Sequence, residues 1–301
     1  MGIVAIIAAL LLEQWRPLAE RTAVAAALGG FAGWLERSFN AGEARHGAIA
    51  WLVAVVPALA GAILIHALLV GLSPLLGLLF DVAALYLTLG FRQFSHSFTA
   101  IQAAIREGEL ERAQSLISGW RGEPGVLRSR EEVIRLAIEE ALIASHRHVF
   151  GVLLWYVVLP GPSGAILYRL AAFLARRWQD LGAFGGFARK AFFVLEWPAV
   201  RFTAAVFAVV GDFEDAAYCW RTQARSWPDP NAGVVLAAGA GAMGVRLGMP
   251  LQEIEGMRPR PELGVGEPAD GPFLDSTVGL LWRALVVWVF ALIVIGVVRL
   301  L

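Results

Sequence analysis

The sequence is poor in lysine, cysteine and charged residues in general. Lys190 is the only lysine and Cys219 the only cysteine among 301 residues, and charged residues make up 17% of the chain. Because Lys190 follows an arginine rather than a glycine, the chain has no Walker-type phosphate loop. A single cysteine excludes an internal disulfide and a cysteine-built metal cage. The net charge of zero provides no basic field for nucleic acid, so no nucleic-acid partner is expected.

The chain is instead rich in apolar residues. Hydrophobic residues make up 58% of it, and the mean hydropathy is +0.64. A hydrocarbon core about 30 Å thick requires roughly 20 apolar helical residues. Ala48–Gly71, Pro74–Phe91 and Thr277–Val298 meet that requirement, and only Leu72 and Ser73 separate the first two. We therefore predict an all-α, polytopic integral membrane helical bundle that lies in a lipid bilayer and contains a helical hairpin.

The distribution of arginine predicts the orientation of this bundle. Residues 92–147 carry eight arginines, and Arg16, Arg21, Arg37 and Arg45 precede the first span, whereas the hairpin tip has none. The positive-inside rule places arginine-rich segments in the cytoplasm.

We describe residues 1–301 as a single membrane domain. Residues 92–148 form a cytoplasmic insert of short helices, and residues 251–276 form a cytoplasmic loop rich in proline and glycine. The sequence shows no β pattern.

Residues 149–175 consist of two short apolar stretches, VFGVLLWYVVL and AILYRLAAFLA, separated by PGPSG. Both outer ends are basic, which places them on the same side of the membrane. We predict a re-entrant helical hairpin, because such broken backbone is tolerated where protein or a watery cavity surrounds it. One kinked spanning helix is the alternative interpretation.

His66 and Asp81 are ionisable residues inside the first two predicted spans. Counting about 1.5 Å per residue from the tip places them at similar depths, so we predict that they meet. An ionisable group inside a membrane is costly unless it is paired. The pair fits a proton-linked or ligand-binding site, and a purely structural clamp is the alternative.

A second polar cluster is predicted on the helix that opens at Ser129 with capping-box spacing to Glu132. Arg135 and Glu139 lie one turn apart on it and are the candidates for catalytic residues. His146 and His148 follow and are predicted to bind a ligand, although their spacing does not suit a metal, so no metal site is expected. Arg201 is predicted to contact an anionic group, because arginine suits bidentate anion binding, and a topology anchor beside the membrane is the alternative.

The stretch DPNAGVVLAAGAGAMGVRLGMP begins at Asp229. We predict a helix capped by Asp229 or Asn231, whose N-terminus is a natural anion site. Small residues at 233, 237, 241, 244 and 248 share one predicted face, which lets another helix approach closely. Self-association through this face, residues 233–248, is the predicted route to a homo-oligomer.

This stretch resembles the SPN-x-G…L-G-G-P element of the CobD/CbiB family of cobalamin-biosynthesis membrane proteins. VIRLAIEEALI is similar to the family's R-A-x-x-E helix and aligns Arg135 and Glu139 with it, and PGPSGAILYRLAAFL is similar to a segment that contributes Tyr168 and Arg169. The resemblance implies a protein of the bacterial inner membrane. It also implies ATP-dependent amide formation between adenosylcobyric acid and aminopropanol or its phosphate, with ATP and Mg²⁺ as cofactors and an anionic or corrinoid ligand.

The chain departs from the family pattern at several acidic and amide positions. Ile143, Ala144 and Arg147 stand where the family has Glu-Asn-x-x-Asp; Ala172–Ala175 stand for Asn-Thr-Leu-Asp, and Phe192 and Phe193 for paired aspartates. Since Mg²⁺ needs hard oxygen ligands, these departures leave open whether the chain is an active synthase.

Other stretches, among them LLLEQWRPL and VLEWPAVRFTAAVF, are similar to AmpE, a membrane protein linked to β-lactamase regulation. A non-catalytic AmpE-like sensor or scaffold is therefore one alternative function. A small transporter that uses His66 and Asp81 is another.

Overall fold

The computed structural model describes residues 2–15, 22–122, 128–253 and 256–298. Arg16 and Arg21, part of the orientation argument, lie outside the described residues. The chain divides into two compact units. Unit 1 contains residues 1–90 and 151–198, and unit 2 contains residues 91–150 and 199–301.

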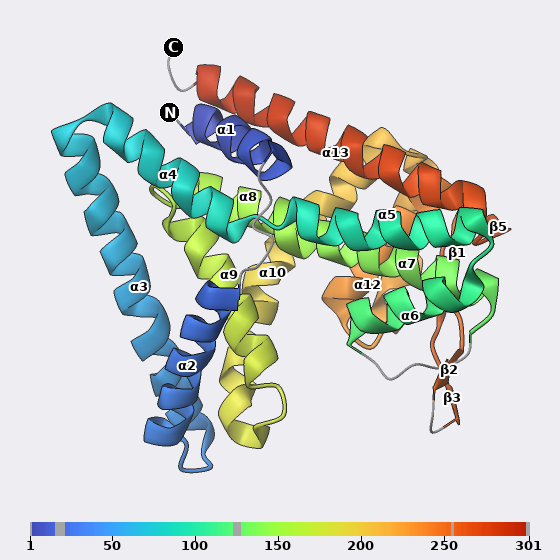
Figure 1. Ribbon diagram of the computed structural model, residues 1–301, viewed down its shortest axis with the longest axis horizontal. Helices are drawn as coiled ribbons and strands as arrows, with labels where there is room; N and C mark the ends of the chain where they lie inside the picture. The colour runs from blue at the N-terminus through green and yellow to red at the C-terminus, as the bar shows by residue number, and fades with distance from the viewer. Residues whose placement is uncertain (1, 16–21, 123–127, 254–255, 299–301) are drawn as a thin grey trace. The chain divides into compact units, whose positions relative to one another are not determined.

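Unit 1 is built from helices. They are α1 (Gly2–Trp15), α2 (Thr22–Phe39), α3 (Ala44–Leu72), α4 (Pro74–Thr88), α8 (Gly151–Val158), α9 (Ser163–Arg177) and the first part of α10 (Gly182–Val210). Figure 1 shows α3 and α4 meeting at a sharp turn, as predicted. Ser73 ends α3 and caps α4: its hydroxyl accepts a hydrogen bond from Leu75 N (3.3 Å), and Pro74 occupies the first helical position.

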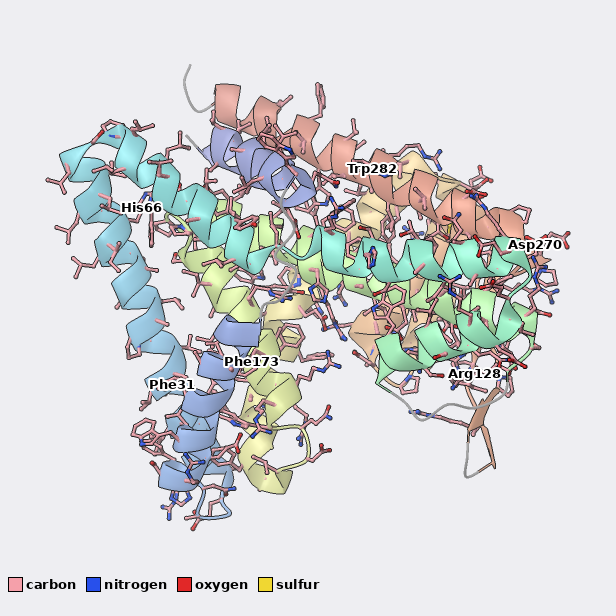
Figure 2. All side chains as sticks on the ribbon, viewed as in Figure 1. Phe31, His66, Arg128, Phe173, Asp270 and Trp282 are labelled. Atoms are coloured by element: carbon pink, nitrogen blue, oxygen red, sulfur yellow. The ribbon has the colours of Figure 1, made fainter. Side chains whose placement is uncertain are left out.

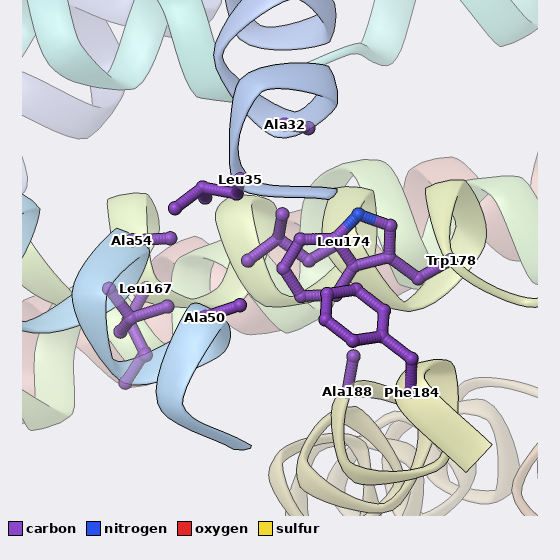
Figure 3. Packing of buried hydrophobic residues seen from close by; sticks show 10 residues of the cluster. Ala32, Leu35, Ala50, Ala54, Leu167, Leu174, Trp178, Phe184 and Ala188 are labelled. Atoms are coloured by element: carbon purple, nitrogen blue, oxygen red, sulfur yellow. The ribbon is translucent and has the colours of Figure 1, made fainter. Parts of the chain in front are cut away.

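The core of unit 1 lies where α2, α3, α9 and α10 pack together. Figure 3 shows Leu35, Leu174, Trp178 and Phe184 gathered in this cluster, all of them buried. The indole of Trp178 donates a hydrogen bond to Glu36 (2.9 Å), which satisfies its polar atom.

Unit 2 combines helices with short strands. Its helices are α5 (Phe91–Glu107), α6 (Leu110–Arg121), α7 (Arg130–Ser145), a π-helical segment (His146–Phe150), the second part of α10, α11 (Phe213–Thr222), a 3₁₀ turn (Ala224–Ser226), α12 (Pro230–Met243) and α13 (Gly271–Val298). The predicted capping box is present: Ser129 N donates to Glu132 (2.9 Å), and Glu132 N donates to Ser129 (3.1 Å).

The strands correct the prediction that the chain contains no β structure. Strand β1 (Val245–Gly248) pairs antiparallel with β4 (Glu262–Leu263) and parallel with β5 (Glu267–Pro268). Strands β2 (Leu251–Glu253) and β3 (Gly256–Arg258) form an antiparallel pair. The predicted loop at 251–276 therefore holds four of these strands and the start of α13. The strands have two to four residues each, too few to show alternation in the sequence.

Helix α12 begins as predicted, since Asp229 accepts hydrogen bonds from the backbone of Asn231 (3.0 Å) and Ala232 (3.4 Å). The predicted small-residue face is shorter than expected. Gly244 has a φ of +66° and ends the helix, and Gly248 lies in β1.

The small residues within α12 pack inside the chain. A Cβ atom on Gly233 would clash with the carbonyl oxygen of Ala224, and one on Gly241 would clash with that of Asp215. Self-association stays a prediction, but the chain itself occupies these two close-approach positions.

The predicted hairpin at 149–175 is present as α8 and α9. Its turn has a φ of +56° at Gly161, and α9 runs back along α8 so closely that a Cβ on Gly164 would clash with the carbonyl of Trp155. The alternative of one kinked helix is therefore wrong. However, α8 is the end of a helix that runs over Arg130–Val158, not an isolated half-helix. Re-entry into a membrane stays a prediction.

Four helices in the described part of the chain are long and apolar enough to cross a membrane. They are Ala44–Leu72, Arg130–Val158, Gly182–Val210 and Gly271–Ala291. The chain is thus an all-α protein in its bulk, with the helix lengths of a polytopic membrane protein.

Candidate functional site

The main polar cluster of unit 2 is centred on Glu139 of α7, which is 2% exposed. Its Oε1 accepts a hydrogen bond from Gly248 N (2.8 Å). Arg260 donates to the same carboxylate from Nη1 to Oε2 (2.8 Å) and from Nη2 to Oε1 (3.3 Å). The helix that carries Arg135 and Glu139 and the stretch that begins at Asp229 therefore meet in space in one polar cluster.

Arg260 is a residue that the sequence reasoning missed. Besides Glu139, its guanidinium donates to the carbonyl oxygens of Gly248 (2.9 Å) and Met249 (3.1 Å) and lies 5.2 Å from the ring centre of Trp227. Its side chain is 7% exposed. The only signal in the sequence is its place between two prolines, Pro259 and Pro261, which stiffen the loop and fix where the side chain starts.

Arg135 lies one turn before Glu139 and is equally buried, at 4% side-chain exposure. Its contacts are much weaker. Its Nη1 lies 3.5 Å from the sulfur of Met249, and the carboxylates of Glu131 and Glu132 each lie 4.0 Å away. Its Nε has no hydrogen-bond partner among the described residues. The structure thus brings both candidate catalytic residues to one place. Only Glu139 has close hydrogen-bond partners for its charged group.

Two departures from the family pattern also meet in unit 2. Arg147 stands where the family motif has an aspartate, and Asp229 where it has a serine. Arg147 Nη2 lies 3.2 Å from Asp229 Oδ2. Since Asp229 also caps α12, this pair anchors the N-terminus of that helix.

Four further residues of unit 2 were predicted to bind a ligand: His146, His148, Arg201 and Asn231. His146 is 1% exposed, and its Nδ1 lies 2.9 Å from the hydroxyl of Thr203. His148 follows in the π-helical segment, Arg201 is on α10, and Asn231 is buried in the first turn of α12. A π-helical segment is often found at functional sites.

Unit 1 holds the second polar cluster. Nδ1 of His66 lies 3.0 Å from Oδ1 of Asp81, which is an ion-pair distance without the alignment of a hydrogen bond. The predicted meeting of these residues is confirmed. The hydroxyl of Tyr156 on α8 donates to Oδ2 of Asp81 (3.1 Å), a partner that the sequence reasoning missed. Figure 2 shows His66 near the end of α3 that adjoins α4.

Tyr168 and Arg169 lie on α9 in unit 1, apart in the chain from the cluster around Glu139. Tyr168 is fully buried, with its ring centre 5.5 Å from that of Phe192. Phe173 and Ala175 stand where the family has a threonine and an aspartate. Phe173 packs against the hydrophobic core, and Ala175 is buried. In unit 1, therefore, apolar packing has taken the place of the acidic set.

Cys219 on α11 is fully buried. Burial, followed by the nearby charge of Asp215, raises the pKa of its thiol to about 11. Because the thiolate is the reactive form, the raised pKa disfavours reaction of Cys219 at neutral pH.

The magnesium ion that the family resemblance implies finds no complete set of side-chain ligands among the described residues. They contain no group of three histidine, cysteine, aspartate or glutamate side chains that could hold a metal ion. Both oxygens of Glu139 are engaged by Arg260 and Gly248 N, so this carboxylate is not free to bind a cation.

The sequence model of the CobD/Cbib protein family matches residues 5–298. A protein of Stutzerimonas stutzeri named cobalamin biosynthesis protein CobD is 33% identical over 296 residues, 96% of each chain. The protein of that name from Chromobacterium violaceum is 36% identical over 220 residues, 71% of this chain and 70% of that one.

A shorter match, 48% identical over 58 residues, is to the protein of the same name from Mycobacterium tuberculosis. It covers 19% of this chain and 18% of that one. No solved structure matches. The predicted similarity to AmpE gains no support from these relatives, whereas a match over nearly the whole length assigns the family: the chain belongs to the CobD/Cbib protein family.

Proposed function

We propose that this chain acts in cobalamin biosynthesis and joins adenosylcobyric acid to aminopropanol or its phosphate through an amide bond. One observation carries the proposal: the hydrogen bond from Gly248 N to Glu139 (2.8 Å) unites the two motif segments of the family in a single buried cluster. A carboxylate and a phosphate ester are both anions, and Arg135 supplies a guanidinium group at this cluster that has no close anion of its own.

The roles of these residues follow from their contacts. Arg260 and Glu139 hold residues 248–249 against α7, which fixes the wall of the site. Arg135 remains available to orient an anionic substrate. Amide formation joins the amine nitrogen to the carboxyl carbon, releases a proton from the amine and breaks the bond between that carbon and one carboxyl oxygen. ATP, which the family resemblance implies, would convert that oxygen into a phosphorylated leaving group. No residue of the cluster is assigned to a metal ion.

Complementation tests this function. A bacterium that lacks its own CobD/CbiB gene and needs cobalamin to grow is supplied with adenosylcobyric acid. We expect this chain to restore growth and Arg260→Ala to fail. Cobinamide, which already contains the amide, should support growth with or without the chain. The proposal is overturned if the strain expresses the chain at a normal level and still grows only when cobinamide is supplied.

We also propose that the chain resides in the bacterial inner membrane. The large exposed side chains on α3 support this, since Val56, Leu64 and Leu68 are each more than half exposed. Alkaline phosphatase fused after Ser73 should be active and the same enzyme fused after Gly122 inactive, because only the hairpin tip is proposed to face outwards. The reverse pattern would overturn this orientation.

A further inference from the structure

Two buried arginines of unit 2 differ in how they are satisfied. Arg260 has both oxygens of Glu139, two carbonyl oxygens and the face of Trp227. Arg135 is as deeply buried and has only a thioether and two carboxylates at 4.0 Å. A buried charge is costly unless it is closely paired, and a thioether sulfur is a weak acceptor. Arg135 therefore lacks a close anion.

The neighbouring carboxylates are not positioned to supply that anion. Glu132 accepts the backbone N–H of Ser129 in the capping box, and Glu139 is bound to Arg260. Glu131 is about half exposed and reaches Arg135 only at 4.0 Å. The guanidinium keeps its Nε without a partner among the described residues.

Met249 is the side chain that covers Arg135. Its backbone is held on both sides: its N–H donates to the carbonyl of Pro261 (3.1 Å), and its carbonyl accepts from Arg260 (3.1 Å). It has a φ of +66°, which is rare for a residue other than glycine, and such conformations cluster at ligand sites. The partly exposed side chain of Met249 is flexible and can move while its backbone stays in place.

We propose that Arg135 binds the phosphate of a phosphate-bearing ligand, which displaces the Met249 thioether from the guanidinium. Two phosphate oxygens match the paired N–H groups of arginine. Under the proposed function, the ligand is aminopropanol phosphate, and the site would favour this phosphorylated amine over aminopropanol. Only this identity of the ligand rests on the proposed function.

Calorimetry on the full chain in detergent tests the site. The probes are aminopropanol phosphate, aminopropanol, inorganic phosphate and a short-chain phosphatidic acid. We expect saturable binding of aminopropanol phosphate that Arg135→Gln weakens roughly 10- to 100-fold, the effect of losing charge-assisted hydrogen bonds. Arg112→Gln, at an exposed surface pair, is the matched control and should change nothing.

Two further variants guard against a folding defect. Arg135→Lys keeps the charge and should retain part of the affinity. Met249→Ala removes the covering thioether while leaving Arg135 intact, and should bind aminopropanol phosphate more tightly than the natural chain. Weaker binding by Met249→Ala, or equal binding by the natural chain and a folded Arg135→Gln, would overturn the proposal. If phosphatidic acid is the only probe whose binding depends on Arg135, the proposal of a soluble phosphate-bearing ligand is rejected.

The outcome is separate from that of the proposed function. Arg135-dependent phosphate binding by a chain that fails complementation would keep the anion site and reject the reaction. A chain that restores growth but binds phosphate equally well with and without Arg135 would keep the reaction and reject the anion site.

Discussion

The two polar clusters of the molecule are built on different principles. In unit 1, His66, Asp81 and Tyr156 come from three apolar helices and form a short chain of contacts of 3.0 and 3.1 Å. In unit 2, Glu139 and Arg260 form a buried, bidentate ion pair that also ties down a loop. The first cluster joins helices that already pack through apolar surface, whereas breaking the second leaves a buried guanidinium without its counter-ion. We therefore expect unit 2 to depend more heavily on its cluster.

The largest expected effect is that of Glu139→Ala. Removing this carboxylate leaves Arg260 buried without its counter-ion, and breaking a buried pair in this way costs about 3–5 kcal/mol of unfolding free energy. Unfolding of the detergent-solubilised chain, followed by thermal or denaturant titration, measures it. Glu109→Ala, which removes half of an exposed pair with Arg112, is the control and should leave the unfolding midpoint in place. Equal shifts in the two variants would refute the structural role of the pair.

The next largest effect tests unit 1 through Gly161→Ala. Gly161 has a φ of +56°, and a Cβ atom there would lie 2.7 Å from Cγ of His66. The added methyl must push the imidazole away from Asp81 or distort the turn, which costs about 1–3 kcal/mol. Gly61→Ala on α3 is the matched control, because no atom lies within 4 Å of its added Cβ and alanine favours a helix. A destabilised Gly61→Ala together with an unaffected Gly161→Ala would contradict the described packing.

A smaller effect is expected from Tyr156→Phe. This change removes one hydrogen-bond donor to Asp81 and keeps the ring, so the loss in unfolding free energy is about 1 kcal/mol. Tyr218→Phe, at a tyrosine that is 56% exposed, should cost less. If the two phenylalanine variants unfold alike, the hydroxyl of Tyr156 does not contribute to the stability of unit 1.

The two clusters also differ in how much of them can be predicted. His66 and Asp81 stand out because they interrupt long apolar runs, and the tight turn at Ser73 fixes which residues face each other. That reasoning predicted their contact correctly. Tyr156 escaped it because a tyrosine at the end of an apolar stretch is unremarkable until the partner helix is known.

In unit 2 the background is already polar, so charge does not mark the site. Arg135 and Glu139 were identified by their spacing and by family resemblance, but Arg260 was not, because it lies more than a hundred residues away in a loop with no periodic pattern. The strands around it were missed for the same reason. Strands of two to four residues are defined by the strands they pair with and not by a pattern in their own sequence. The helices, whose contacts are local, were predicted well.

The smallest expected effect is that of a change in unit 1 on the stability of unit 2. The rate at which Cys219 reacts with a thiol reagent can measure it. As the only cysteine, buried on α11 of unit 2, it reacts with a thiol reagent only when that region opens. Burial and Asp215 raise its pKa to about 11, so in the folded chain the thiol is protonated at pH 8 and labelling is slow.

Because the folded pKa is the higher one, the protonated thiol favours folding below pH 9, and this contribution is lost as the pH rises through 11. At pH 8, Glu139→Ala should speed labelling markedly, since it loosens unit 2, whereas Gly161→Ala should leave the rate unchanged. Equal acceleration by both variants would show that the clusters stabilise one cooperative structure, and the contrast between them would then be one of chemistry and not of stability.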